Sequence, residues 1–262
     1  MADQQILTET RGRVGIMKLN RPDRRNAVSD EMRQEIRETV DAYNADAGIG
    51  AMVLTGVDPA FCGGADVGGW KRDLDADTRE SRPPSPGLNW LELFSTAKPI
   101  VCAVNGPSIG MGLTITLSCD ARIASDRARF SMRFIRVGMV PELASTKLLP
   151  LIVGLNRALE LMLTGKTIDA AEAERIGLVS RVVPHEKLMD EAVALAAEMA
   201  SNPTELLQTI KRLTWQHIGE GDLLKIMIAE STELRAAMQR PAFREAVNAF
   251  MEKRQPDFHK GG

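Results

Sequence analysis

The stretch "KPIVCAVNGPSIGMGLTITLSCDARIAS", residues 98–125, changes character in its middle. An apolar run ends at Asn105-Gly106, the turn Gly110-Met111-Gly112 follows, and a sequence that suits a helix comes next. Because glycine permits backbone angles and close contacts that a Cβ forbids, the flanking glycines leave the Met111 N–H facing open space. At the start of a helix this N–H has no partner within the helix, so it is a candidate donor to a negative oxygen.

This turn has competing interpretations. Its glycines would also suit a tight turn whose only purpose is packing. A dinucleotide-binding fingerprint, G-x-G-x-x-G, would need glycine at position 115, and Ile115 stands there.

A second glycine bend comes earlier, in "AMVLTGVDPAFCGGADVGGW", residues 51–70. A strand-like run leads into Gly63-Gly64, and Ala65 and Asp66 follow at what suits the start of a helix. Two such bends can aim two backbone N–H groups at one point. This arrangement stabilises an oxyanion, and one such donor contributes roughly a hundredfold to a thousandfold to a reaction rate.

Composition indicates a globular protein of 262 residues, with a hydrophobic fraction of 44% and a charged fraction of 26%. A net charge of -2 gives no electrostatic case for nucleic acid. No apolar stretch approaches the ~20 residues that cross a bilayer, and the N-terminus lacks the apolar core of a secretory signal. We therefore expect a cytoplasmic protein without a membrane partner. Cys62, Cys102 and Cys119 lack metal-ligand spacing, so we expect reduced thiols and no metal site.

Short runs rich in Val and Ile predict buried strands at residues 14–20, 51–56 and 100–106. Between the first two, Ser29 can cap a helix whose apolar face is formed by Met32, Ile36, Val40 and Tyr43. Further on, Asp169 and Glu172 suit a capping box.

From about residue 186 the pattern is helical. Pro241 suits a first helical turn, and an apolar stripe follows at Phe243, Val247, Phe250 and Met251. That stripe must pack either on the chain's own core or on a neighbouring subunit. The charged and Pro/Ser-rich segment near residues 73–87 predicts a mobile insertion.

Six segments, in order, resemble the enoyl-CoA hydratase/isomerase family, also called the crotonase family. They are "LNRPDRRNAVS" (19–29), "FCGGADV" (61–67), "KPIVCAVNGPSIGMG" (98–112), "CDARIAS" (119–125), "LTGKTIDAAEAERIGLVSRVV" (163–183) and "AFMEKRQPDF" (249–258). The resemblance implies an α/β fold, a spiral of repeated β-β-α units with a helical C-terminal region. It implies a spiral core over 1–200 with the acyl-CoA site and a trimerisation region over 201–262, assembled as a homotrimer or a dimer of trimers.

The same resemblance places Ala65 and Met111 at the family's two oxyanion-hole N–H donors, flanked by Gly64, Gly110 and Gly112, with the thioester oxygen of an acyl-CoA between them. Coenzyme A enters as part of the substrate, and no separate cofactor is implied. The residues that match the coenzyme A segments are Arg24, Arg25, Ala27 and Asp66, together with Phe250 and Lys253 from the tail of a neighbouring subunit.

Hydratases of the family use two glutamates, and the corresponding positions here hold Thr114 and Phe134, which we expect only to line the substrate. Neither side chain can act as a carboxylate. Glu142, in "VGMVPELAST", resembles the catalytic base of peroxisomal-type 3-enoyl-CoA to 2-enoyl-CoA isomerases. An alternative is a glutamate in the first turn of a helix, where the dipole favours it. We predict a single-base isomerase with Glu142 as its base.

Other functions stay open. A hydratase with a non-standard catalytic set would hydrate a 2-enoyl-CoA, and a non-catalytic acyl-CoA-binding homologue would bind tightly without turnover. A hydrolase with Glu142 as nucleophile would leave a trapped acyl-enzyme. His185, His217 and His259 are isolated in the sequence, without a Ser/Asp constellation.

Overall fold

The computed structural model describes residues 4–66 and 90–259, so the predicted insertion at 73–87 lies outside the described residues. In the described part, six strands form the larger sheet, in the order β1-β2-β3-β4-β6-β9. β1 pairs antiparallel with β2, and the other neighbours are parallel. The strands are β1 (Ile6–Arg11), β2 (Val14–Leu19), β3 (Ala51–Gly56), β4 (Ile100–Val104), β6 (Ala121–Ser125) and β9 (Arg181–Val183). The three predicted strands are thus confirmed, and they lie side by side.

A smaller sheet of β5 (Pro107–Ile109), β7 (Arg129–Ser131) and β8 (Thr167–Asp169) is built as the chain leaves the larger one. β5 follows directly on β4, and β7 follows directly on β6. After β3, Cys62 forms a parallel bridge to Ser108 in β5. From β4 to β7, two successive turns of the chain each contribute one strand to the larger sheet and one to the smaller, which produces a spiral.

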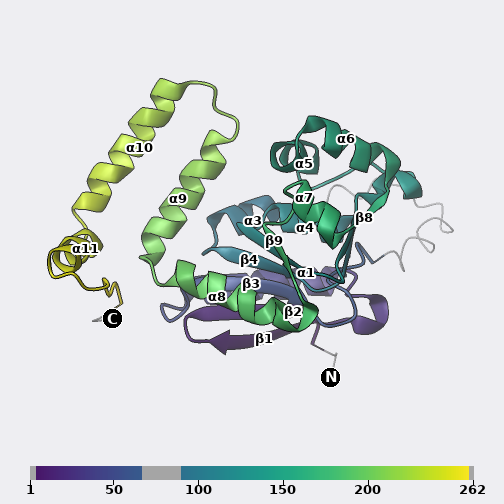
Figure 1. Ribbon diagram of the computed structural model, residues 1–262, viewed down its shortest axis with the longest axis horizontal. Helices are drawn as coiled ribbons and strands as arrows, with labels where there is room; N and C mark the ends of the chain where they lie inside the picture. The colour runs from purple at the N-terminus through teal and green to yellow at the C-terminus, as the bar shows by residue number, and fades with distance from the viewer. Residues whose placement is uncertain (1–3, 67–89, 260–262) are drawn as a thin grey trace.

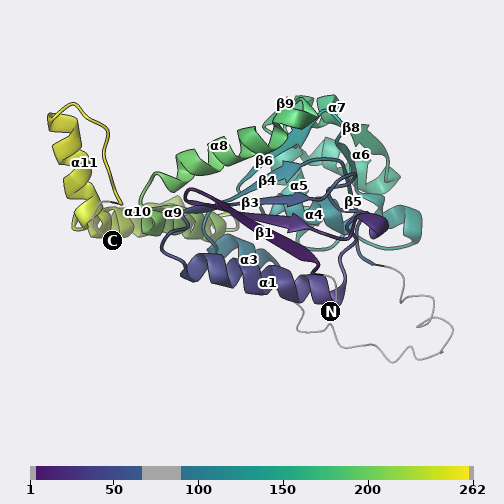
Figure 2. The same cartoon turned by 90° about the horizontal axis from the view of Figure 1, so that it is seen from below.

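Helices cover both faces of the larger sheet, with α8 (Leu188–Ala200) on one side and α1 (Asp30–Ala45) on the other (Figure 2). The Ser29 side chain caps α1 as predicted, accepting from the Met32 N–H at 3.1 Å. Because both faces are covered, every residue of β3 and β4 is buried, which explains why their sequences are apolar apart from Thr55, whose hydroxyl donates to the Ala103 carbonyl.

The remaining helices of the body connect the strands. They are η1 (Pro22–Arg24), α3 (Trp90–Thr96), α4 (Met111–Leu117), η3 (Arg133–Val137), α5 (Ser145–Val153), α6 (Leu155–Thr164), α7 (Ala170–Arg175) and η4 (His185–Lys187). The capping box predicted for α7 is half formed. Asp169 accepts from the Glu172 N–H at 2.8 Å, while the Glu172 carboxylate binds Arg175. An i,i+3 ion pair thus takes the place of the reciprocal bond.

The C-terminal helices α9 (Thr204–His217), α10 (Leu223–Met238) and α11 (Pro241–Met251) extend away from the body (Figure 1). Pro241 opens α11, as predicted. The apolar stripe of α11 is exposed, with Phe250 at 81% and Met251 at 75%. A single chain therefore leaves this stripe unburied. The boundary between residues 200 and 201 coincides with the end of α8, but its role as a domain limit stays a prediction.

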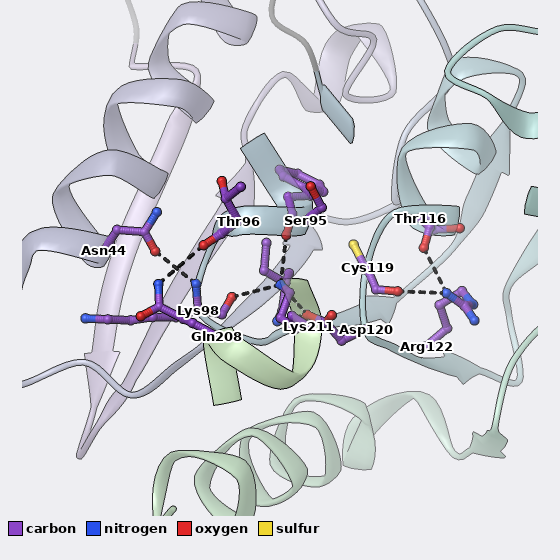
Figure 3. A network of polar contacts seen from close by, with 12 residues as sticks. Asn44, Ser95, Thr96, Lys98, Thr116, Cys119, Asp120, Arg122, Gln208 and Lys211 are labelled. Atoms are coloured by element: carbon purple, nitrogen blue, oxygen red, sulfur yellow. Dashed lines mark hydrogen bonds and ion pairs between the residues drawn. The ribbon is translucent and has the colours of Figure 1, made fainter. Parts of the chain in front are cut away.

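A buried ion pair anchors α9 to the body (Figure 3). The Lys211 ammonium donates to Asp120 Oδ2 and to the Phe94 carbonyl, both at 2.8 Å. The same Asp120 oxygen accepts from the Ile100 N–H at 2.7 Å, at the start of β4. Burial raises the pKa of Asp120, and the charge of Lys211 opposes that rise. The pair thus joins the C-terminal arm to the central strand.

We predict that Lys211→Met lowers the free energy of unfolding by about 3 kcal/mol at pH 7, because it leaves a buried carboxylate uncompensated. Without the cation the pKa of Asp120 in the folded chain rises further. The loss of unfolding free energy is therefore greatest at pH values where Asp120 is ionised in both the folded and the unfolded chain. It shrinks as the pH falls and the carboxyl group is protonated in the folded chain. Urea unfolding at pH 7 and pH 5 measures both effects. Adding Asp120→Asn should recover part of the loss; equal losses at the two pH values would contradict this account.

Candidate active site

Backbone pairing brings the two glycine bends together. The Cys62 N–H donates to the Pro107 carbonyl at 3.0 Å, and the Ile109 N–H donates to the Cys62 carbonyl at 3.0 Å. The two segments run parallel from this bridge, which centres on Cys62 and Ser108. Three residues further along each segment lie Ala65 and Met111. Because the two segments run parallel and both residues lie three positions beyond the bridge, Ala65 and Met111 lie toward the same end of the site.

Glycine is required at this junction for contact as well as for conformation. A Cβ on Gly112 would lie 2.3 Å from the Cys62 carbonyl oxygen, a distance that real Cβ atoms do not reach. Gly64 and Gly110 have φ values of +112° and +55°, in the region that side chains disfavour. Packing alone therefore does not explain these glycines. Gly112 allows the backbone of α4 to lie against Cys62, whereas Gly64 and Gly110 adopt the positive φ values that set the direction of the chain.

Both candidate amides lack a partner within the described chain. The bonds on either side of Ala65 run from the Val28 N–H to the Gly64 carbonyl (2.8 Å) and from the Asp66 N–H to the Val28 carbonyl (3.0 Å). The Ala65 N–H therefore faces away from Val28. Met111 is the first residue of α4, where an N–H has no intrahelical acceptor. Within residues 4–66 and 90–259, no acceptor bonds either N–H.

The segment proposed to hold coenzyme A lies beside the first bend. The Gly63 N–H donates to the Arg25 carbonyl at 2.8 Å. Arg21, which sequence reasoning missed, joins the two segments: it donates to the Ala27 carbonyl at 2.7 Å and pairs with Asp66 at 2.7 Å. Arg24 and Arg25 are exposed and Ala27 is half-buried. Exposed guanidinium groups at this edge are available to phosphates.

The two positions of the hydratase glutamates border the second bend. Thr114 is fully buried in α4, and its hydroxyl donates to the Met111 carbonyl at 3.1 Å. Phe134, buried in η3, has its ring 4.0 Å from where a Cβ on Gly110 would lie. A committed hydroxyl and a phenyl ring offer no acid or base here.

Glu142 lies in the connection between η3 and α5, where Leu143 and Ala144 both have φ of +55°. α5 begins at Ser145, and its N–H donates to the Glu142 carbonyl at 3.1 Å, so Glu142 lies at the entry to the helix, before the first turn, as the alternative of a helix-entry glutamate also allows. Glu142 is exposed to water in the single chain. The surrounding protein nevertheless desolvates it and raises its pKa, while the charge of Arg33 acts in the opposite direction.

Arg33 is a second residue that the sequence did not reveal. It lies on α1, and its Nη2 is 3.4 Å from the Met111 Sδ. The two residues are 78 positions apart, so no local pattern connects them. Arg33 thus contacts Met111, and its charge acts on the carboxylate of Glu142.

The tail residues do not reach this site within one chain. Phe250 and Lys253 are exposed at the end of α11, which lies at the far side of the molecule from α4 (Figure 1). Their predicted contact with coenzyme A therefore requires a neighbouring subunit.

Other reactive side chains are occupied elsewhere. The three cysteines are free and buried, and burial raises the pKa of Cys62 to about 12, which keeps it a thiol. His185 was expected to be isolated, but it contacts the Ser125 hydroxyl at 3.0 Å and Asp58 Oδ2 at 3.1 Å. These partners are 60 and 127 residues away in the sequence, so its spacing did not reveal them. Ser125 is fully buried and accepts from the Arg127 N–H, so it is no accessible nucleophile. No group of three or more metal-ligating side chains occurs among the described residues.

Comparison with known proteins identifies the family. The profile of the enoyl-CoA hydratase/isomerase family matches residues 9–261. The chain belongs to this family. Its resemblance to the family, and the enzymatic class that the family implies, are therefore confirmed.

Relatives match over nearly the whole chain. A probable mitochondrial enoyl-CoA hydratase of Dictyostelium discoideum is 34% identical, over 96% of this chain and 90% of its own length. A probable enoyl-CoA hydratase of Rhizobium meliloti is 33% identical, over 98% and 99%. A crystal structure of an enoyl-CoA hydratase subunit from Geobacillus kaustophilus superposes with a TM-score of 0.85 at 34% identity, over 97% and 98%. The predicted α/β crotonase fold with a helical C-terminal region is thus confirmed. Every helix of this enoyl-CoA hydratase/isomerase homologue within residues 4–66 and 90–259 is too short or too polar to span a bilayer.

We predict that Gly112→Ala displaces Met111, because the new Cβ meets backbone that cannot move without breaking the Cys62 bridge. Overpacking of this kind costs about 1–3 kcal/mol of unfolding free energy. Turnover of an enoyl-CoA should fall by about a hundredfold, the effect of losing one oxyanion donor. Gly219→Ala, where nothing lies within 4 Å of the added Cβ, is the control and should change stability by less than about 0.5 kcal/mol. Similar behaviour of the two variants would refute the requirement for close contact at Gly112.

Proposed function

We propose that the protein binds the thioester oxygen of an enoyl-CoA between the N–H groups of Ala65 and Met111. The observation that supports this is the pair of unpartnered amides at two bends tied by the Cys62 bridge. Negative charge that develops on the thioester oxygen is stabilised by donors that already point at it. The donors belong to the backbone, so they need no ionisable side chain.

Glu142 is the proton carrier of this proposal. With a 3-enoyl-CoA, its carboxylate removes a proton from C2, and the electron pair moves through C1 onto the thioester oxygen to give a dienolate. The protonated Glu142 then returns the proton at C4, which leaves the double bond between C2 and C3. One carboxyl group performs both transfers, and this fits a site in which Thr114 and Phe134 carry no acid or base.

Hydration of a 2-enoyl-CoA is the second candidate, and the names of the relatives favour it, since those in Dictyostelium and Rhizobium are both called probable enoyl-CoA hydratases. In that reaction water adds at C3 and a proton at C2. Glu142 would then position and deprotonate the water through the same raised pKa. Product analysis separates the two activities, because hydration yields a 3-hydroxyacyl-CoA and isomerisation leaves the mass unchanged.

Coenzyme A extends from the thioester toward Arg24 and Arg25, whose exposed guanidinium groups suit its phosphates. Ala27 and Asp66 lie beside this segment, joined to each other through Arg21. Lys253 and Phe250 complete the site from a neighbouring chain. Coenzyme A is part of the substrate in this proposal, which needs no additional cofactor, and a cytoplasmic location is proposed with it.

Assembly as a homotrimer or a dimer of trimers accounts for the exposed apolar surface. Large apolar side chains are exposed on η3, α5 and α6 of the body and on α10 and α11 of the arm. Surfaces of this kind mark contacts between chains. The exposed residues of the arm include Leu223, Leu224, Met227, Ile228, Leu234, Met238, Phe243, Val247, Phe250 and Met251.

We predict that Glu142→Gln reduces enoyl-CoA turnover by at least a hundredfold, because the amide neither accepts nor returns a proton at neutral pH. The measurement is steady-state turnover of a 3-enoyl-CoA and, separately, of a 2-enoyl-CoA, with products identified by mass spectrometry. Glu186→Gln, at an exposed site in η4, is the matched control and should behave as wild type. Unchanged turnover on both substrates in the Glu142 variant would eliminate Glu142 as the base.

We predict that the chain sediments as a trimer or hexamer, and that Val247→Asp shifts it toward single chains of 28.7 kDa. The new carboxylate would have to be desolvated in a contact that buries the α11 stripe. Asn248→Asp introduces the same side chain one residue further along, outside the stripe, and should leave the sedimentation coefficient unchanged. A wild-type chain that sediments as a monomer would contradict the proposed assembly.

A further inference from the structure

Arg33 has donors that the fold does not use. A guanidinium carries five N–H donors. Among residues 4–66 and 90–259, the buried Nε of Arg33 has no hydrogen-bond partner, and the contact of Nη2 is with the weak acceptor Met111 Sδ, at 3.4 Å. The nearest carboxylate on its own helix, Asp30, is 3.8 Å from Nε, and the side chain of Asp30 is 86% exposed. An exposed pair at that distance contributes little. The Arg33 guanidinium therefore contributes little to the stability of α1, and its position indicates another function.

The guanidinium lies where charge moves during the proposed reaction. It packs on the side chain of Met111, whose N–H is one of the two proposed oxyanion donors. Its positive charge also acts on Glu142, where it lowers the pKa that burial raises. Other charged residues on the neighbouring elements are Arg133 and Arg136 of η3 and Lys147 of α5. The charge that opposes the rise in the pKa of Glu142 is that of Arg33.

We propose that Arg33 is a positioning residue of the acyl-CoA site: its guanidinium, packed on Met111, supplies positive charge to Glu142 before proton transfer and to the thioester oxygen after it. This inference rests on the proposed function. Before the transfer the negative charge is on Glu142; afterwards Glu142 is neutral and the enolate oxygen carries the charge. In this proposal one cation compensates the negative charge in both states, so the proton moves without a change in the net charge of the site.

The first test is the pH dependence of kcat for Arg33→Met. Loss of the cation raises the pKa of Glu142, so the acidic limb of the profile should move to higher pH, while the plateau at high pH changes less. Arg33→Lys keeps the charge and should restore the wild-type position of that limb. Arg37→Met removes a cation one turn further along α1 and should leave the profile unchanged. Arg33→Gln is measured in parallel, and thermal unfolding verifies that each variant is folded.

The second test measures enolate binding without turnover. Acetoacetyl-CoA has an acidic C2 proton, and its enolate absorbs in the near ultraviolet. Arg33→Met should weaken binding of the enolate by about tenfold, the effect of losing a nearby charge at a partly desolvated site, and Arg33→Lys should weaken it less.

The outcomes separate the inference from the function on which it rests. If Glu142→Gln is inactive while Arg33→Met and Arg33→Gln both keep the wild-type pH profile and enolate affinity, the inference is wrong and the proposed function stands. If Glu142→Gln is fully active, the proposed function itself is wrong. A shifted acidic limb that Arg33→Lys restores supports both.

Discussion

The structure of the site depends on the parallel backbone bridge between Cys62 and β5. β3 and β4 are parallel neighbours, so the segments that follow them leave the same edge of the sheet, where ligand sites of α/β proteins generally lie. The bridge then fixes one segment against the other, and the absence of a Cβ at Gly112 allows the contact. Two amides that are distant in sequence are thereby left without partners at one end of the bridge. The proposed oxyanion hole is a consequence of strand order and one glycine contact.

Charge enters this site through few side chains. Desolvation by the surrounding protein raises the pKa of Glu142, which makes its carboxylate a stronger base, and a nearby cation limits that rise. The charge of Arg33 opposes this rise in pKa. Arg33 lies on α1, and its guanidinium contacts the side chain of Met111. Desolvation and the nearby cation thus act on the base in opposite directions, and the balance between them sets the pH at which the base is available. The left-handed residues Leu143 and Ala144 hold the chain at this position immediately before α5.

The sequence predicted elements whose signals are local. The predicted runs at 14–20, 51–56 and 100–106 are apolar, short and ended by glycine or asparagine, and α1 has both a cap and a regular apolar face. The smaller sheet was not predicted because each of its strands has three residues, too few for a periodicity. The contacts that organise the site were equally hidden. Arg21 and Asp66 are 45 residues apart, Arg33 and Met111 are 78 apart, and Lys211 and Asp120 are 91 apart. Glycine bends revealed Ala65 and Met111, whereas side-chain partners required the fold.

A site built on main-chain amides separates binding from the choice of reaction. The N–H groups of residues 65 and 111 are donated by the backbone, so they remain whatever side chains occupy those positions. The reaction is then decided by the acids and bases that face the acyl chain. A buried hydroxyl at Thr114 and a phenyl ring at Phe134 offer no acid or base, and the proposed proton carrier is the carboxylate of Glu142 on the connection before α5. Isomerisation needs one carrier that gives back the proton it took, whereas hydration also needs a bound water held at C3. The number of proton carriers around the amides, more than the amides themselves, therefore determines which of the two reactions this fold performs.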